Sequence, residues 1–269
     1  MPELPEVEAV RREVSPWLLQ RTITRAKLLD APQGPKYAGL SLLKDARIEA
    51  VNRRGKFIVC PLSNGHELVI HLGMTGVLTR MRPEKHGRVI LHLAESEPVF
   101  FKDVRRFGRF CVAPGGDRRL LPTLFKMGPE PLSRAFTVSD FAGRLKSNTA
   151  IKSWLLTQRP VAGVGNIYAD ESLWRAGISP FKPARQLSNP EIERLHEAIR
   201  DILTDAVSAG GTTIKDFETG AGKQGRYGQA LKVYGRAAQP CIECGQPLQR
   251  AVLHQRTTVW CARCQESSG

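Results

Sequence analysis

The sequence predicts a two-domain α+β protein, with a β-rich N-terminal part and a helical C-terminal part. Short apolar runs of strand length recur up to residue 113, and turns containing glycine or asparagine separate them, as in a sandwich or barrel. From Thr137 onwards, apolar residues recur with helical spacing. Two Cys-x2-Cys pairs near the C-terminal end predict a hairpin held by a metal ion.

The N-terminal part is expected to open with a helix from about Pro5 to Leu19, because its valines recur on one face. Strands should follow, with buried thiols at Cys60 and Cys111 inside apolar runs. These elements predict a first domain over residues 1–120. The expected strands are Thr22–Leu28, Arg47–Asn52, Lys56–Pro61, Glu67–Leu72, Val77–Arg80, Arg88–Leu93, Val99–Lys102 and Gly108–Ala113.

A segment with little periodicity, residues 121–135, is expected to link this domain to the helical part. The helical pattern ends at the glycine pair Gly210-Gly211, which predicts a second domain over residues 136–222. A metal-binding segment should occupy residues 235–269. The expected helices are Ser139–Lys146 behind a serine cap, Ile151–Thr157, Asn166–Ala176 and Asn189–Ala209.

Four cysteines have the spacing of a four-thiolate zinc site, because Cys241 and Cys244 are followed after sixteen residues by Cys261 and Cys264. One structural Zn²⁺ would stabilise a segment too small for a hydrophobic core of its own. Two disulfides are the alternative interpretation. No secretory segment is recognisable, so we expect a cytoplasmic protein, in which disulfides rarely persist.

The charge balance indicates a polyanionic partner. The chain has 40 basic and 26 acidic residues, a formal net charge of +14. Residues 1–134 carry 23 basic and 14 acidic side chains, and residues 135–269 carry 17 and 12, so both halves are basic. No apolar run approaches the length of a membrane span, and no basic amphipathic helix with an aromatic face is present. Nucleic acid is therefore favoured over a membrane surface.

The N-terminal stretch Met-Pro-Glu-Leu-Pro-Glu carries the most specific chemistry. Removal of Met1 would leave Pro2 with a free secondary amine, which can attack an aldehyde carbon and form a charged iminium. An α-amino group titrates at about 7.7–8.0, so a nucleophilic fraction exists at neutral pH. Glu3 and Glu6 add nearby carboxyl groups for proton transfer. The alternative is an ordinary helix start, with proline first and acids in the first turn.

Six motifs in order resemble the bacterial formamidopyrimidine-DNA glycosylase (MutM) family over essentially the whole chain. The start Pro-Glu-Leu also favours the purine-directed branch, because the relatives that act on oxidised pyrimidines usually have glycine at the position of Leu4. The matching motifs are the N-terminal Pro-Glu-Leu-Pro-Glu-Val-Glu, Asn-Arg-Arg-Gly-Lys at 52–56, His-Leu-Gly-Met-Thr-Gly at 71–76, Asp-Val-Arg-Arg-Phe-Gly at 103–108, Val-Gly-Asn-Ile-Tyr-Ala-Asp-Glu at 164–171 and the cysteine cluster.

The resemblance implies an antiparallel β-sandwich domain, a helix–two-turn–helix domain and a zinc-finger hairpin. It also implies excision of oxidised purines from duplex DNA, followed by β,δ-elimination. By similarity, Pro2 attacks C1′ of the damaged nucleotide, Glu3 protonates the sugar, and Glu6 supports the geometry. Lys56 would contact a phosphate as a point charge. A solvated surface lysine is its alternative.

The resemblance further implies that Met74, Arg105 and Phe107 enter the duplex and fill the space of the extruded nucleotide, with His71 among the DNA contacts. Such insertion is physically reasonable, because an enzyme that acts on a base must extrude it and apolar wedges offset the lost stacking. The alternatives are a core histidine, ordinary packing by Met74, and a buried strand aromatic at Phe107.

The remaining implied DNA contacts lie in the C-terminal half. Asn166 is expected at a helix N-cap, where it could also contact phosphate. Lys152 would lie near the lesion, and Arg256 would contact phosphates from the tip of a hairpin that bends at Gln255-Arg256. Residues 215–229 match the family's lesion-capping loop.

The expected partner is double-stranded DNA with damaged bases, bound by a monomer that associates with the nucleoid. Two alternatives remain open: the same chemistry directed at oxidised pyrimidines, and a non-enzymatic zinc-ribbon protein that binds nucleic acid. Borohydride trapping separates the second alternative from the enzyme, because only an iminium is reduced to a stable covalent complex.

Overall fold

The computed structural model describes residues 1–213, 220, 222 and 224–265, and the chain divides into two compact units. The first unit comprises Met1–Phe125 and Ala209–Arg226. The second comprises Lys126–Ser208 and the residues from Tyr227 onwards. Among the described residues, no helix combines the length and the apolar character needed to cross a membrane.

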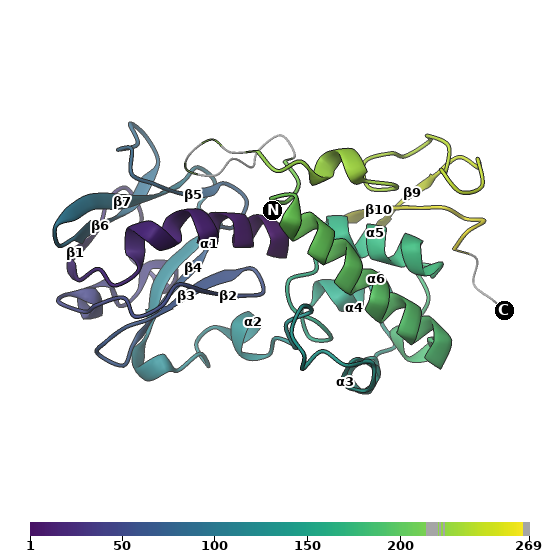
Figure 1. The fold of residues 1–269 in the computed structure, drawn as a ribbon, viewed down its shortest axis with the longest axis horizontal. Coiled ribbons are helices and arrows are strands. Elements are labelled where there is room, and N and C mark those ends of the chain that lie inside the picture. Colours follow the sequence, from purple (N-terminus) through teal and green to yellow (C-terminus); the bar gives the residue numbers. More distant parts are fainter. Residues whose placement is uncertain (214–219, 221, 223, 266–269) are drawn as a thin grey trace. The chain divides into compact units, whose positions relative to one another are not determined.

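The first unit is built around helix α1 (Leu4–Leu18), drawn in purple in Figure 1. Val7, Val10, Val14 and Leu18 are buried on one side of this helix, as the valine spacing predicts. The helix begins at Leu4, one residue before the expected start, because Glu3 takes the N-cap position with an extended backbone.

Two four-stranded antiparallel sheets accompany α1 in the first unit. One has the order β1-β6-β7-β5 and the other β2-β3-β4-β8. The strands of the first sheet are β1 (Ile23–Leu28), β5 (Gly76–Thr79), β6 (Gly87–Leu93) and β7 (Ser96–Asp103). Those of the second are β2 (Asn52–Arg54), β3 (Phe57–Pro61), β4 (Glu67–His71) and β8 (Arg109–Ala113).

Alternate residues of both sheets join the valine stripe of α1 in one buried cluster. Val89 and Leu91 of β6 and Leu68 and Ile70 of β4 are members of it, which confirms the predicted antiparallel sandwich. Cys60 is also a member and Cys111 is buried, as expected. Burial, together with the charge of Glu67, raises the pKa of the Cys60 thiol to about 12, so this thiol is unreactive at neutral pH.

The expected strand Arg47–Asn52 is wrong. Arg47 forms an isolated bridge with Thr22, and Ile48 forms one with Leu62. Because these neighbours pair with different segments, no continuous ladder develops there, and the strand begins only at Asn52. The segment expected to be an irregular linker contains the short helix α2 (Pro122–Phe125).

The second unit contains four α-helices and one β-hairpin among its described residues. Thr137, rather than a serine, caps the first helix, because its hydroxyl accepts the Asp140 backbone N–H at 3.1 Å. The elements are α3 (Val138–Arg144), α4 (Ile151–Leu156), α5 (Asn166–Ala176), α6 (Asn189–Ser208), β9 (Gln249–Leu253) and β10 (Arg256–Trp260).

The hairpin bends one residue earlier than expected. His254 and Gln255 both have positive φ, 44° and 61°, which is the geometry of a tight two-residue connection. Arg256 is therefore the first residue of β10 and pairs with Leu253 across the hairpin.

Candidate functional site

Pro2 and Glu3 are buried at the start of the first unit, where the Glu6 carboxylate bonds to the backbone. Glu3 is 2% exposed, and Pro2 beside it is also buried. Glu6 Oε2 accepts the Glu3 backbone N–H at 2.8 Å, and Glu6 Oε1 accepts the Thr212 backbone N–H at 2.7 Å. Glu6 thereby positions the backbone beside Pro2, and the two donors offset part of its lost hydration.

The contact with Thr212 depends on the glycine before it. Gly211 has a φ of +84°, and a Cβ at this position would lie 2.7 Å from Glu6 Oε1. The sequence suggested only a helix end at this glycine pair. Gly211 also lets the chain approach Glu6 closely, so that Glu6 and Thr212 can bond although they are 206 positions apart. No local sequence signal predicts this contact.

Lys56 and His71 are neighbours across two strands of the same sheet. Lys56 follows Gly55, whose φ is 55°, in the turn between β2 and β3, and it is 5% exposed. Its neighbour Phe57 is paired with His71 at the end of β4, and their ring centroids are 4.7 Å apart. The alternative of a solvated surface lysine is wrong, because the side chain is buried.

His71 is neutral at physiological pH. Burial, followed by the charges of Lys56 and Arg109, lowers the pKa of this imidazole to about 4, although Asp103 acts in the opposite direction. Its Nδ1 accepts the Gly73 backbone N–H at 3.2 Å, which requires an unprotonated Nδ1. His71 thus shapes the turn that carries Met74.

The structure brings the three proposed wedge residues onto two adjacent turns of the first unit. Met74 is in the turn between β4 and β5, and Arg105 and Phe107 are in the turn between β7 and β8. The Arg105 guanidinium lies 4.9 Å from the centre of the Phe107 ring. Phe107 is 52% exposed, so the alternative of a buried strand aromatic is wrong.

Two residues not singled out from the sequence join these turns. Thr75 Oγ1 donates to Asp103 Oδ1 at 2.6 Å and accepts the Arg105 backbone N–H at 3.0 Å. Asp103 Oδ2 accepts the Gly108 backbone N–H at 2.7 Å. Both residues lie inside the matched motifs, but nothing in the sequence indicated that they bond to each other.

Asn166 does not cap its helix. Gly165 occupies the N-cap, and Asn166 is the first residue of α5. Its Nδ2 donates to the Thr257 carbonyl of β10 at 3.1 Å, and its buried Oδ1 accepts no hydrogen bond from the described residues. The expectation failed because the extended backbone of the N-cap lies one residue earlier than predicted, at Gly165, where φ is −123° and ψ is −153°.

Lys152 also differs from expectation. Its side chain is 1% exposed, and its ammonium contacts the Asp170 carboxylate at 2.7 Å, the Thr257 carbonyl at 2.8 Å and the Thr258 hydroxyl at 2.9 Å. A buried ammonium with these partners is not presented to DNA in this arrangement. The residue instead joins α4 to α5 and β10.

Asp170 completes this buried pair. Burial raises the pKa of Asp170 to about 7, despite the Lys152 ammonium and the Val259 backbone N–H, both of which favour the charged form. The Val259 N–H donates to Asp170 Oδ2 at 3.2 Å. Strand β10 therefore lies against α5 through two polar contacts, from Asn166 to Thr257 and from Asp170 to Val259.

The four predicted metal ligands form one cluster in the second unit. The sulfurs of Cys241, Cys244, Cys261 and Cys264 all lie within 4.8 Å of one another. The spacings of 3.4 Å and 3.9 Å within this cluster suit a tetrahedral Zn²⁺, whose Zn–S bonds of about 2.3 Å place the sulfurs roughly 3.8 Å apart. The four cysteines fit a structural zinc ion. Because Cys261 directly follows β10, the metal would also fix this strand, which begins at the exposed Arg256.

The lesion-capping loop expected at residues 215–229 falls partly outside the described residues, which omit 214–219, 221 and 223. Within the described part, the Arg226 backbone N–H donates to the Ala209 carbonyl at 3.0 Å. This bond joins the two ends of the segment Ala209–Arg226, and the Glu6–Thr212 bond connects the segment to α1 in the first unit, so the first unit includes residues that the sequence assigned to a helical domain ending at 222.

Three family models match successive parts of the chain. The formamidopyrimidine-DNA glycosylase N-terminal domain matches residues 1–110, and the H2TH domain of the same glycosylase matches residues 127–218. The zinc finger found in FPG and IleRS matches residues 238–266. The H2TH and zinc-finger matches agree with the expected helix–two-turn–helix domain and zinc-finger hairpin.

Relatives and solved structures agree with these matches. A formamidopyrimidine-DNA glycosylase of Thermus thermophilus is 45% identical over 98% of both chains, and that of Deinococcus radiodurans is 40% identical over 98% of this chain and 97% of its own. The crystal structure of MutM (Fpg) from Thermus thermophilus superposes with a TM-score of 0.91 at 43% identity and covers both chains fully.

A Lactococcus lactis Fpg mutant in complex with Fapy-dG containing DNA has a TM-score of 0.86 at 33% identity, covering 99% of this chain and 100% of its own. Another structure, MutM in complex with carbocyclic 8-oxo-G containing DNA, has the same TM-score at 34% identity, with the same coverage. Taken with the matches to the N-terminal, H2TH and zinc-finger models, these similarities show that the chain belongs to the formamidopyrimidine-DNA glycosylase family.

Proposed function

We propose that this protein is a bifunctional DNA glycosylase and AP lyase of base excision repair that removes oxidised purines from duplex DNA. The observation that carries the proposal is the buried start of α1, where Glu3 adjoins Pro2. There the Glu6 carboxylate accepts the backbone N–H groups of both Glu3 and Thr212. Named relatives and neighbours support the substrate class, because two of the neighbours contain Fapy-dG or 8-oxo-G in their DNA.

The chemistry begins after Met1 is removed. The free Pro2 nitrogen attacks C1′ of the damaged nucleotide, the C1′–N bond to the base breaks, and Glu3 protonates the sugar so that its ring opens. The resulting iminium withdraws electrons from the sugar. Proton loss and departure of the two flanking phosphates then follow as β- and δ-elimination, which cut the strand on both sides of the lost base.

The DNA contacts divide by chemistry. Lys56, Asn166 and Arg256 would contact phosphates, which position the duplex without reading its sequence. Met74, Arg105 and Phe107 would fill the space that the extruded nucleotide leaves, and the turn next to His71 presents the first of them. Lys152 is not among these contacts, because its ammonium bonds to Asp170 and to the Thr257 carbonyl within the second unit.

The test uses the full-length protein and borohydride trapping. Duplexes that contain 8-oxoguanine or an oxidised pyrimidine are incubated with the wild type and with Pro2→Gly and Glu3→Gln. We expect trapping and excision on the purine lesion by the wild type, weakened or redirected trapping with Pro2→Gly, and loss of excision with Glu3→Gln, which should still cut a preformed abasic site.

Glu97→Gln is the matched control, because Glu97 is 72% exposed and pairs only loosely with Arg80, at 3.6 Å. The proposal fails if Pro2→Gly, or protein that retains Met1, traps DNA at the native rate. Faster excision of the pyrimidine lesion would instead move the enzyme to the oxidised-pyrimidine branch.

Two further properties belong to this proposal. The protein acts as a monomer, which light scattering of the DNA complex can measure. It works in the cytoplasm in association with the nucleoid, and a fluorescent fusion that fails to co-localise with DNA would contradict this location.

A further inference from the structure

We propose that Arg88 is a positioning residue for the turn that carries Arg105 and Phe107. The inference rests on the proposed function, since that turn has a role only if the protein extrudes a damaged nucleotide. Arg88 is the second residue of β6, is 1% exposed, and belongs to no motif that pointed to the family.

The Arg88 guanidinium bonds to the backbone where β7 ends. Its Nε donates to the Asp103 carbonyl at 2.8 Å, and one Nη2–H points to the Val104 carbonyl at 3.5 Å. These two carbonyls come directly before Arg105. A planar guanidinium can contact two successive carbonyls in one plane, which a lysine ammonium does with less precise orientation.

The other side of Asp103 continues the connection to the wedge. Its carboxylate accepts the Thr75 hydroxyl and the Gly108 backbone N–H, and Thr75 accepts the Arg105 backbone N–H. Arg88 therefore fixes the start of the turn through the Asp103 backbone, while the Asp103 side chain fixes its end. The bonds from Arg88 and from Gly108 to Asp103 are buried, and buried bonds are costly to leave unmade, so the turn has few alternative conformations.

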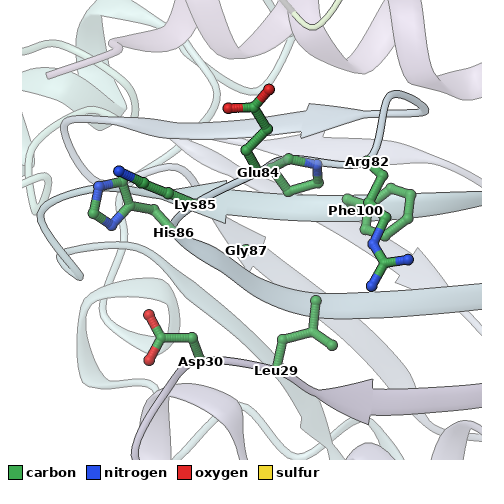
Figure 2. Close-up of a pocket in the computed structure, with 9 residues that line it drawn as sticks. Leu29, Asp30, Arg82, Glu84, Lys85, His86, Gly87 and Phe100 are labelled. Atoms are coloured by element: carbon green, nitrogen blue, oxygen red, sulfur yellow. The ribbon is translucent and has the colours of Figure 1, made fainter.

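The remaining partners of Arg88 are Asp30, which is exposed to solvent, and His86, which is half-buried. Its Nη1 donates to both the carbonyl and the carboxylate of Asp30, the latter at 2.8 Å, and its Nη2 lies 3.5 Å from His86 Nδ1. Asp30 and His86 both line a cavity of about 490 Å³ (Figure 2). The Asp30 side chain is 70% exposed, so this ion pair is screened and contributes little.

The buried contact with the Asp103 carbonyl therefore dominates the role of Arg88. A substitution there should affect the wedge turn more than the sandwich core, because the Asp30 end already faces an open cavity. Pro2 and its carboxylates lie at the start of α1, whereas Arg88 bonds to the end of β7 and to Asp30. Base extrusion and the chemistry at Pro2 should then respond differently.

The test compares the wild type with Arg88→Met, Arg88→Lys and Thr75→Val. Single-turnover excision of 8-oxoguanine should fall about tenfold or more in Arg88→Met and Thr75→Val, and the ratio between cytosine and adenine as the opposite base should shrink. Cutting of a preformed abasic site and affinity for undamaged duplex should change by less than about twofold, because they need no paired base to be extruded. Arg88→Lys should recover part of the excision rate.

Arg118→Met is the matched control, because Arg118 makes a bidentate pair at 2.7 Å with Glu67 of β4 in the same unit, rather than with the turn. A second measurement needs no DNA. Hydrogen exchange in a peptide covering residues 103–110 should accelerate about tenfold in Arg88→Met and remain native in Arg118→Met, since only the first loses carbonyl contacts at the turn.

Native exchange at the turn in a folded Arg88→Met protein overturns the proposal. Equal losses of lesion excision and abasic-site cutting would also overturn it, because they indicate a general loss of structure. A wild type that excises no lesion overturns both this inference and the proposed function, whereas an active wild type with unaffected Arg88 variants overturns this inference alone.

Discussion

Arg105 in the first unit and Arg256 in the second are both exposed at tight turns, but different chemistry stabilises the two turns. The turn that carries Arg105 in the first unit is held by hydrogen bonds: the Arg105 N–H donates to Thr75, Thr75 donates to Asp103, and Arg88 donates to the Asp103 carbonyl. Arg256 in the second unit starts a strand that is braced by four cysteines and by the buried pair of Lys152 and Asp170.

The difference follows from the amount of core available. The wedge turns extend from a sandwich with a large apolar cluster, so a few hydrogen bonds are enough to select one conformation. The hairpin has a small cluster that includes Val233, Leu248 and Val259, and its stability must come from the metal. A substitution at the wedge turns should therefore disturb only those turns, whereas loss of a metal ligand should disorder the whole hairpin of the second unit.

The largest expected effect tests the metal brace. Cys261→Ser should release zinc and disorder the β9–β10 hairpin, because structural zinc sites contribute on the order of 10 kcal/mol to folding. Duplex affinity should fall although Pro2 is untouched. Metal analysis and titration of undamaged DNA measure both effects. Cys111→Ala is the control and should keep its zinc; active protein without zinc would contradict the prediction.

The next effect tests the buried pair. Lys152→Met should lower the free energy of unfolding of the second unit by about 3–5 kcal/mol, because it leaves the Asp170 carboxylate buried without its cation. The pKa of Asp170 is already raised to about 7, and loss of the ammonium raises it further. A buried acid with a raised pKa stabilises the fold only when protonated, so the variant should be more stable at pH 6 than at pH 8.

Denaturant titration at both pH values measures this dependence. Arg175→Met breaks an exposed pair with Asp201 and should cost no more than about 1 kcal/mol. The double variant Lys152→Met, Asp170→Leu should recover most of the loss. A cost in Lys152→Met as small as that of Arg175→Met would mean that the buried pair does not brace the hairpin.

A smaller effect concerns acid sensitivity in the first unit. The pKa of His71 is lowered to about 4 from an ordinary 6.5, so the fold prefers the neutral imidazole. Its contribution, at most about 3 kcal/mol, is present above pH 6.5 and is lost as the pH falls towards 4. An NMR titration of the imidazole measures the pKa directly. His71→Gln should flatten the dependence of stability on pH, and an ordinary pKa would refute this account.

The smallest effects separate the two arginines. Arg256→Ala should weaken binding to all duplexes by about tenfold and reduce the salt dependence by roughly one phosphate contact, while zinc is retained. Arg105→Ala should leave undamaged-duplex affinity nearly unchanged and blur the discrimination of the opposite base. If Arg105→Ala instead lowers undamaged affinity as much as excision, Arg105 is another phosphate contact and the contrast between the two turns disappears.

Much of the fold could be predicted because its signals are local. Helix α5 has the expected bounds, Asn166–Ala176, and the strands at Phe57–Pro61 and Glu67–His71 lie within one residue of their predictions. These segments have clear apolar periodicity and strong turn residues at their ends. The expected strand at Arg47–Asn52 failed because its residues pair with two different partners, which periodicity does not encode.

The sequence alone determined most of the elements, the zinc ligands and the chemical character of the N-terminus, because spacing, charge and residue type act over short distances along the chain. Only the tertiary structure decided which partners the polar side chains contact. It placed the Lys152 ammonium against Asp170 and β10, gave Asn166 a partner in Thr257, and joined Glu6 to Thr212. Each of these contacts depends on burial and on residues far apart in sequence, since a buried polar group must take whichever partner the packed chain brings within reach.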